Sequence, residues 1–310
     1  MGKTGIKTKH LLSITDLTPQ EVHSLLDYAI ELKSRGWISL LKNRTLAILF
    51  EKPSLRTRVS FEVAMRQLGG QTIYLSPDEV GLGKRESIPD VARVLSRFVD
   101  GIVLRTFAQH NLQVLAEYSS VPVINALSDY EHPCQALADL LTIYEKKRKL
   151  KGLTFGYIGD ANNMANSLIL ACAMTGINFN IASPKGYTID KAVLKKARSY
   201  AKDSGSKIFC SEDPREAAKN VDIIYTDTWT SMGQEAEAEV RRKVFADYQI
   251  NEKLLALTKK SSIIMHCLPA HHGEEVAVGI LDSARSVVFD QAENRMHAQK
   301  ALLAWMLAKK

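Results

Sequence analysis

The chain has 310 residues, of which 45% are hydrophobic and 24% charged, and its formal net charge is +7. This length exceeds the usual size of a single core, so we expect two globular domains, and the composition excludes a largely disordered protein. No apolar run approaches the roughly 18 to 20 residues of a membrane helix, and the basic segment 1–10 lacks the apolar centre of an export signal. We therefore expect a cytoplasmic protein with no membrane partner.

The cysteines and the basic residues exclude further classes. No C-x-x-C spacing occurs among the four cysteines, which disfavours a zinc ribbon and a thioredoxin-like site. The densest basic run, 146–151, contains no aromatic residue, so it is poor material for binding nucleic acid and is interpreted as a solvated linker. The positive charge is therefore more consistent with an anionic substrate than with a nucleic acid partner.

The first half of the chain begins with a predicted helix. Thr18-Pro19-Gln20-Glu21 is a capping box with proline at the first helical position, and apolar residues follow at helical spacing until Gly36. Short apolar runs then alternate with amphipathic stretches, which is typical of a parallel sheet covered by helices. The expected strands are 46–50, 72–75, 101–104 and 122–125. The expected helices are 57–68, 88–99, 110–118 and 134–145.

The same alternation restarts after the basic run. The expected strands are 153–158, 178–182, 207–210, 222–226 and 262–267. The expected helices are 163–175, 190–202, 214–219, 236–246 and 251–257, and a last helix in 292–310 can dock back on the first domain. We predict an α/β protein with two doubly wound parallel-sheet domains, residues 1–147 and 148–291, and an active site in the cleft between them.

The segment Ser54-Leu55-Arg56-Thr57-Arg58 lies where a predicted strand gives way to a helix. The first N–H groups of a helix have no intrahelical partner, so they and the helix dipole favour a bound anion. Arginine forks and hydroxyl groups add phosphate-binding donors. Neither G-x-x-x-x-G-K-[ST] nor G-x-G-x-x-G occurs, which favours a small phosphorylated metabolite over a nucleotide. The alternative is a serine N-cap followed by two solvated arginines.

Further polar residues follow other predicted strands, where ligands bind in open parallel sheets. His132 and Gln135 can point the same way from a helix start and donate to one carbonyl oxygen, or they can be a cap and a solvent-facing glutamine. Asp227 precedes a segment without helical or strand period, so its carboxylate can hold an ammonium group or serve as a turn residue. Asn162 and Asn163 resemble a helix cap but can also receive a carboxylate.

Cys267 comes at the end of the predicted strand 262–267. It can be a thiolate nucleophile paired with a histidine, or it can line a pocket without covalent chemistry. The ring of His266 points to the opposite face of an extended strand, so it is a poor base for Cys267. A zinc site formed with His271 and His272 is disfavoured because adjacent histidines do not have ligand spacing.

Four ordered motifs resemble those of the aspartate/ornithine carbamoyltransferase family. The family's S-x-R-T-R, H-P-x-Q, D-x-x-x-S-M-G and H-C-L-P match Ser54–Arg58, His132–Gln135, Asp227–Gly233 and His266–Pro269. The last two are similar to the ornithine branch. The resemblance covers nearly the whole chain and implies transfer of the carbamoyl group of carbamoyl phosphate to the δ-amine of L-ornithine, in arginine biosynthesis or in the reverse, catabolic direction. It implies no metal and no organic cofactor.

The resemblance also implies roles for single residues. The implied carbamoyl phosphate-binding residues are Ser54, Leu55, Arg56, Thr57, Arg105, His132, Gln135, Cys267, Leu268 and Arg295. The implied ornithine-binding residues are Asn163, Asp227, Ser231 and Met232. Arg56, Arg105 and His132 are implied to stabilise charge on oxygen, and Cys267 is implied to lie near the reacting amine. Arg58 is implied to be structural.

A homotrimer or an assembly of trimers is a further implication of the resemblance. Lys84 or Arg85 of the segment Gly81–Ser87 is implied to complete the site of a neighbouring subunit. One departure stands at His272, where many relatives carry an arginine; if that arginine braces the loop, histidine weakens the brace or makes it pH-sensitive. Two rival interpretations are a carbamoyltransferase for another amine, such as putrescine or lysine, and a non-catalytic phosphate- or RNA-binding protein.

Overall fold

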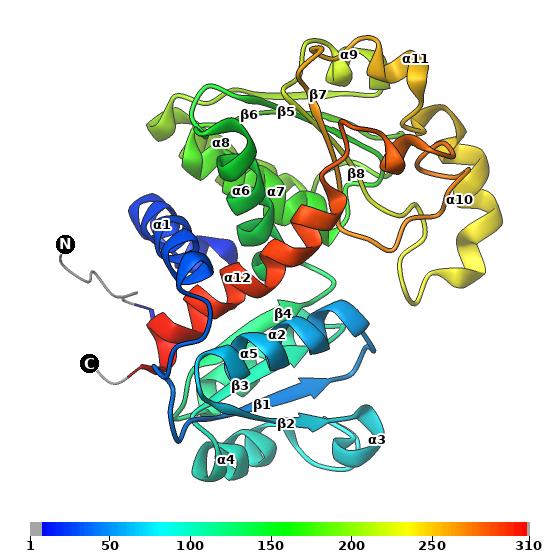
Figure 1. The fold of residues 1–310 in the computed structure, drawn as a ribbon. Coiled ribbons are helices and arrows are strands. Elements are labelled where there is room, and N and C mark those ends of the chain that lie inside the picture. Colours follow the sequence, from blue (N-terminus) through cyan, green and yellow to red (C-terminus); the bar gives the residue numbers. More distant parts are fainter. Residues whose placement is uncertain (1–7, 309–310) are drawn as a thin grey trace. The chain divides into compact units, whose positions relative to one another are not determined.

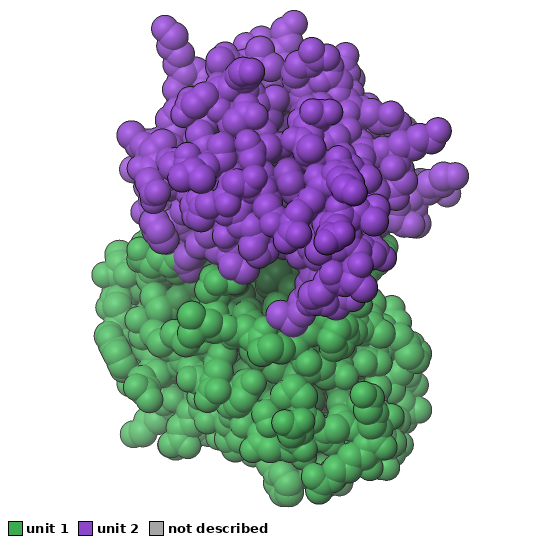
Figure 2. Space-filling view, turned by 90° about the vertical axis from the view of Figure 1, so that its right-hand side faces the viewer, with its two compact units in different colours: residues 1–141, 293–310 green, residues 142–292 purple. Residues whose placement is uncertain are grey.

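The computed structural model describes residues 8–308 (Figure 1). The chain divides into two compact units, which Figure 2 colours separately. The first unit comprises the residues up to Leu141 together with those from Glu293 onward, and the second comprises Thr142–Ala292. The divisions fall inside α6 (Pro133–Lys147) and α12 (Val288–Leu307). Within the described residues, no helix combines the length and the apolarity that crossing a bilayer requires.

The first unit contains a four-stranded parallel sheet. Its strands are β1 (Thr45–Phe50), β2 (Gln71–Leu75), β3 (Gly101–Arg105) and β4 (Val123–Leu127), in the order β2-β1-β3-β4. Its other helices are α1 (Pro19–Arg35), α2 (Leu55–Gln67), α3 (Pro77–Val80), α4 (Ile88–Phe98) and α5 (Gln109–Tyr118). The strand order reverses direction between β1 and β3, and in open α/β sheets ligands bind at such a switch point.

The second unit contains a five-stranded parallel sheet. Its strands are β5 (Thr154–Ile158), β6 (Asn178–Ala182), β7 (Ile208–Ser211), β8 (Ile223–Thr226) and β9 (Ile263–His266), in the order β7-β6-β5-β8-β9. Its helices are α7 (Asn163–Thr175), α8 (Lys191–Ser204), α9 (Pro214–Ala218), α10 (Ala238–Phe245) and α11 (Glu252–Leu255). The switch point of this sheet lies between β5 and β8.

Local sequence signals explain how the elements begin and pack. The predicted capping box is present at α1, where Thr18 Oγ1 accepts the N–H of Glu21 at 3.2 Å and the Glu21 carboxylate accepts the N–H of Thr18 at 2.8 Å. In β5, a Cβ at Gly156 would lie 2.8 Å from the carbonyl oxygen of Ala217 in α9. Glycine at this position therefore lets α9 pack directly on the sheet.

The prediction of two α/β parallel sheets is confirmed, and each predicted strand and helix has a counterpart. Some ends differ. The last strand stops at His266, so Cys267 lies beyond it. α6 continues through Lys147, so the start of the basic run is helix rather than linker; cations in a last helical turn favour the dipole. α12 begins at Val288 instead of 292, because Val288 packs in the core of the second unit. α3 was not predicted.

Candidate functional site

The carboxyl ends of β1 and β3 carry the predicted anion-binding residues. Ser54 caps α2: its Oγ accepts the N–H of Thr57 at 3.2 Å and lies 3.0 Å from Thr57 Oγ1. Arg105 is the last residue of β3 and pairs in register with Phe50, the last residue of β1. The serine cap is therefore real, and the helix start and Arg105 lie at the same edge of the sheet, at its switch point.

Arg295 from α12 joins this group. Its Nη2 donates to Thr57 Oγ1 at 2.7 Å, and its side chain is buried, as is that of Arg105. Arg56 is partly buried, and its Nε is enclosed without a hydrogen-bond partner among the described residues. Buried guanidinium groups are costly unless an anion compensates them, so this cluster is suited to a phosphate.

His132 lies buried immediately before α6. Burial lowers its pKa well below the usual value, and the charges of Arg295, Arg105 and Arg56 lower the pKa further. The ring is therefore neutral at physiological pH, and a neutral N–H can donate to an oxyanion without transferring its proton.

Gln135 is buried in the first turn of α6, so the alternative of a solvent-facing glutamine is wrong. Its Nε2 donates to Asp139 Oδ1 at 2.8 Å, and its Oε1 has no hydrogen-bond partner among the described residues. Arg58, in contrast, is exposed: its Nε donates to Glu62 at 2.9 Å, and its guanidinium lies 3.8 Å from the centre of the Tyr74 ring. These contacts fit the structural role that the resemblance implies for Arg58.

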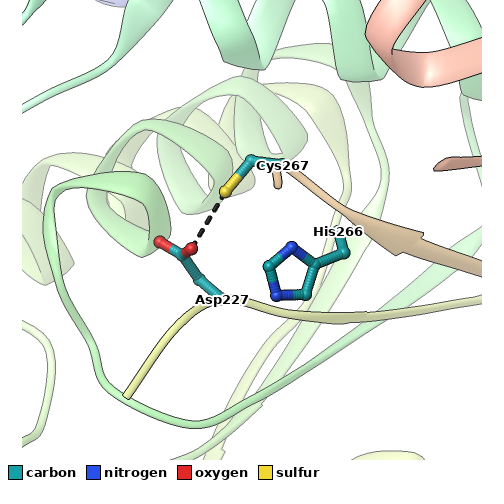
Figure 3. Close-up of side chains that lie close together, drawn as sticks. All are labelled: Asp227, His266 and Cys267. Atoms are coloured by element: carbon teal, nitrogen blue, oxygen red, sulfur yellow. Dashed lines mark hydrogen bonds between the residues drawn. The ribbon is translucent and has the colours of Figure 1, made fainter. Parts of the chain in front are cut away.

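Asp227 and Cys267 meet beyond the ends of β8 and β9 (Figure 3). Cys267 Sγ donates to Asp227 Oδ1 at 2.9 Å, and the same oxygen accepts the N–H of Thr228 at 2.8 Å. The other oxygen accepts Asn162 Nδ2 at 2.8 Å. The thiol, the backbone N–H and the amide that donate to Asp227 are all neutral. They hold the buried carboxylate in place and leave its charge available to an ammonium group.

Asn162 is the asparagine that contacts Asp227. Its Oδ1 accepts the N–H groups of Met164 and Ala165, so it also caps α7 as the sequence suggested. Asn163, the residue that the resemblance singles out, is the first residue of α7 at the same edge of the sheet. An N-cap side chain turns back toward its own helix. The capping pattern in the sequence could therefore have predicted the orientation of the Asn162 side chain.

His266 belongs to a separate buried network. Its Nε2 lies 3.2 Å from Glu275 Oε1, and its Nδ1 accepts the N–H of Leu268 at 2.8 Å. The expectation that His266 is not the base for Cys267 agrees with this geometry. Potential ligand atoms of Asp227, His266 and Cys267 lie within 4.8 Å of one another, but both ring nitrogens of His266 already have partners, so hydrogen bonds account for the cluster.

The remaining predicted residues lie in loops. Ser231 is partly buried and Met232 is exposed in the segment after Asp227. Lys84 and Arg85 are exposed. Their backbone N–H groups donate to the carbonyl oxygen of Gly81 at 2.9 and 2.8 Å, which forms a turn. His271 rather than His272 contacts a neighbour of Asp227, because its Nδ1 lies 3.1 Å from Thr228 Oγ1. The predicted pH-sensitive device at His272 stays a prediction.

The fold is that of a two-domain α/β protein, with a cluster of cationic side chains at the strand ends of one unit and a buried carboxylate at those of the other. The comparisons with known proteins specify the family. The model described as "Aspartate/ornithine carbamoyltransferase, carbamoyl-P binding domain" matches residues 9–145, and the one described as "Asp/Orn binding domain" of the same family matches 151–306. The chain belongs to the aspartate/ornithine carbamoyltransferase family.

Individual relatives agree with this assignment. The chain is 52% identical over 306 residues to the ornithine carbamoyltransferase of Anoxybacillus flavithermus, covering 97% of this chain and 98% of that protein. It is 50% identical over 307 residues to that of Pyrococcus horikoshii, covering 98% and 97%. The solved structure of ornithine carbamoyltransferase from Pyrococcus furiosus superposes with a TM-score of 0.96 at 48% identity and covers 99% of both chains.

Proposed function

We propose that this enzyme transfers the carbamoyl group of carbamoyl phosphate to the δ-amine of L-ornithine, giving L-citrulline and phosphate. The observation that carries this conclusion is the group formed by buried Arg105, Arg295 and neutral His132 with partly buried Arg56, at the switch point of the first sheet. Such a group fits a phosphorylated carbonyl compound. The identities of about 50% to ornithine carbamoyltransferases support ornithine as the acceptor.

In this proposal the first unit holds carbamoyl phosphate. The phosphate lies at the N-terminus of α2, against the backbone of Leu55, the hydroxyls of Ser54 and Thr57 and the three arginine side chains. His132 and Gln135 of the first unit hold the carbamoyl group, together with the backbone carbonyls of Cys267 and Leu268, which belong to the second unit. The exposed side chain of Leu55 is consistent with a role for its backbone alone.

The second unit holds the amino acid. Asp227 pairs with the α-ammonium of ornithine, and Asn163 contacts its α-carboxylate. Ser231 and Met232, in the segment after β8, also contact the amino acid. Cys267 lies near the δ-amine as a binding group, because its thiol already donates to Asp227. The neutral donors around Asp227 support this assignment, since they orient the carboxylate without cancelling its charge.

The reaction follows from these positions. The lone pair of the neutral δ-amine attacks the carbamoyl carbon, and the carbonyl oxygen takes up charge that His132 and the arginines stabilise. The bond from that carbon to the phosphate oxygen then breaks, the electron pair leaves with the phosphate, and the proton lost by the amine passes to the departing phosphate. Positioning and fixed donors together can contribute on the order of 10 kcal/mol, which is enough without a covalent intermediate, metal or organic cofactor.

The decisive assay offers the purified protein carbamoyl phosphate with ornithine, lysine, putrescine or aspartate, and measures phosphate release and the carbamoylated product. We expect ornithine-dependent citrulline formation that exceeds the rate with each other amine. Phosphate release that does not depend on ornithine would refute the proposal. Putrescine lacks the carboxylate of ornithine, and the side-chain amine of lysine is one methylene further from its α-carbon. A faster reaction with either amine would therefore favour that rival acceptor over ornithine.

We also propose a cytoplasmic homotrimer or assembly of trimers, in which Lys84 or Arg85 of one subunit completes a neighbouring site. Exposure of both side chains in the described structure supports this. Two inactive variants, His132→Ala and the pair Lys84→Ala with Arg85→Ala, are refolded together. Hybrid trimers contain sites with both intact parts, so we expect activity to return. Activity that stays absent in mass-verified hybrid trimers would contradict a shared site.

A further inference from the structure

The segment that follows Asp227 has a buried root and an exposed tip. We call residues 228–234 the substrate loop. Trp229 near its start is only 4% exposed and stacks on Phe245 of α10, with ring centres 6.0 Å apart. Met232 near its tip is 45% exposed. The loop is therefore anchored in the core of the second unit at one end and open to solvent at the other.

Arg241 of α10 forms the polar part of this anchor. Its Nε donates to the backbone carbonyl of Trp229, and its Nη2 donates to Asp160 beyond the end of β5. Its Nη1 lies 3.4 Å from Glu237. The guanidinium also packs against the ring of Tyr187, 4.9 Å from the ring centre. One side chain thus connects the loop root, the carboxyl end of β5 and the helix that follows the loop.

Burial makes this connection specific. The Arg241 side chain is 3% exposed, so its charge needs a fixed partner. Burial raises the pKa of Asp160 to about 6, although the neighbouring Arg241 charge acts in the opposite direction. An ammonium group in place of the guanidinium could keep the charge pair, but it lacks the fork that reaches both Asp160 and the Trp229 carbonyl.

The anchored carbonyl lies close along the chain to the groups assigned to the amino acid. Trp229 is two residues after Asp227 and two residues before Ser231. Two residues span at most about 7 Å, so fixing this carbonyl limits where Ser231 can reach. Beyond it, the N–H of Ser231 donates to Gln234 Oε1 at 3.1 Å, so the contacts of the tip are made within the loop rather than with the core.

We propose that Arg241 is a positioning residue for the amino-acid substrate, which it serves by holding the root of the substrate loop through the Trp229 carbonyl. The inference rests on the proposed function, since it takes ornithine as the ligand of this loop. It adds a residue that touches no substrate. Its loss is expected to weaken ornithine binding while carbamoyl phosphate binding, which is assigned to other residues, is retained.

The test compares Arg241→Lys with the wild-type enzyme. We expect the KM for ornithine to rise about tenfold, the effect of losing one charge-assisted hydrogen bond, and the KM for carbamoyl phosphate to stay within about twofold. The inhibition constant of L-norvaline, which is ornithine without its δ-amine, is expected to rise in parallel because only the α-ammonium and carboxylate are then recognised. An unchanged KM for ornithine, or an equal rise for both substrates, would overturn the inference.

Two further variants separate positioning from stability. Asp160→Asn still offers an oxygen to Arg241 and leaves the Trp229 bond in place, so we expect a lower melting temperature with the KM for ornithine within about threefold. A rise equal to that of Arg241→Lys would show a general loosening and contradict the proposal. The neighbouring Arg242, which is exposed and pairs with Glu274, provides the control Arg242→Lys, with no change expected.

If Arg241→Lys does not fold, the double variant Asp160→Asn with Arg241→Met removes both buried charges together. Replacing a buried ion pair as a whole is far less destabilising than breaking it, so this protein is expected to fold. It still lacks the donor to the Trp229 carbonyl, and the KM for ornithine must again rise selectively. Because wild-type citrulline formation is measured alongside, failure of the proposed function is distinguished from failure of this inference.

Discussion

Lys300 provides the sharpest stability prediction, because it is a fully buried lysine in α12 of the first unit. Its Nζ donates to Gln67 Oε1 at 3.0 Å, to the carbonyl of Leu32 at 3.2 Å and to the carbonyl of Gly36. The two carbonyls lie at the C-terminal end of α1, where helix carbonyls have no intrahelical donor. We expect Lys300→Met, which keeps most of the side-chain volume, to destabilise this unit.

The size of the effect follows from the three contacts. Each buried acceptor left without a donor costs about 1–3 kcal/mol, and loss of a cation at a helix C-terminus adds about 0.3–1 kcal/mol. Removing a buried charge returns part of this, since burial itself lowers the pKa of Lys300 and so disfavours its charged form. We therefore expect a net loss of about 2–4 kcal/mol in the free energy of unfolding of the first unit.

Urea unfolding followed by tryptophan fluorescence measures this loss. Trp305 stacks on Tyr28 at 5.8 Å, so a background with Trp37→Phe and Trp229→Phe reports on the contact between α12 and α1. The matched control is Lys33→Met, which removes a partly exposed lysine of the same contact and is expected to cost less than about 1 kcal/mol. Equal stability losses for Lys300→Met and Lys33→Met would refute the reasoning.

Two other predictions concern the reaction and the pH dependence of stability. Cys267→Ser keeps a donor to Asp227 and is expected to retain at least about a tenth of the wild-type kcat in a citrulline assay; complete loss with a trapped carbamoyl-thioester would show nucleophilic catalysis instead. Burial lowers the pKa of His10 to about 4. Between about pH 6.5 and pH 4 the unfolded chain therefore binds a proton at this residue that the folded chain does not. As a result, the free energy of unfolding falls as the pH falls toward 4. His10→Asn keeps an acceptor for the N–H of Val123 and is expected to remove about 1–2 kcal/mol of this decline, a value reduced because the ring is partly solvated. Urea titrations at several pH values measure the decline, and an unchanged decline in the variant would contradict the assignment.

The sheets and the candidate site residues could be predicted because their signals are local. Apolar runs mark buried parallel strands, and polar residues directly after them fall at one sheet edge whatever the connections are. The cap of Ser54 followed from the same local pattern. A strand end says less about the side chain beyond it, so Asn162 and Asn163 could be placed at the edge without showing which one contacts Asp227.

The long-range polar contacts could not be predicted in this way. Arg241 and Lys300 occur among polar residues of helices, where arginine and lysine are usually solvated, and their partners Asp160 and Leu32 lie far away along the chain. Glu275 has the same character, since it follows another glutamate in a loop and yet is buried against His266. Such pairs depend on how separate elements pack, and no periodicity in the sequence reports that.

The first unit also has an unusual order of synthesis. Its core uses residues up to Leu141 and then those from Glu293 onward, so the entire second unit is translated in between. At about 5–20 residues per second, this interval lasts on the order of ten seconds. During this interval the nascent first unit lacks Lys300, which caps the C-terminal end of α1, and Arg295, which contacts Thr57. A ribosome-bound chain therefore carries an incomplete candidate anion site, and α12 supplies both the missing packing and the missing positive charges of the first unit.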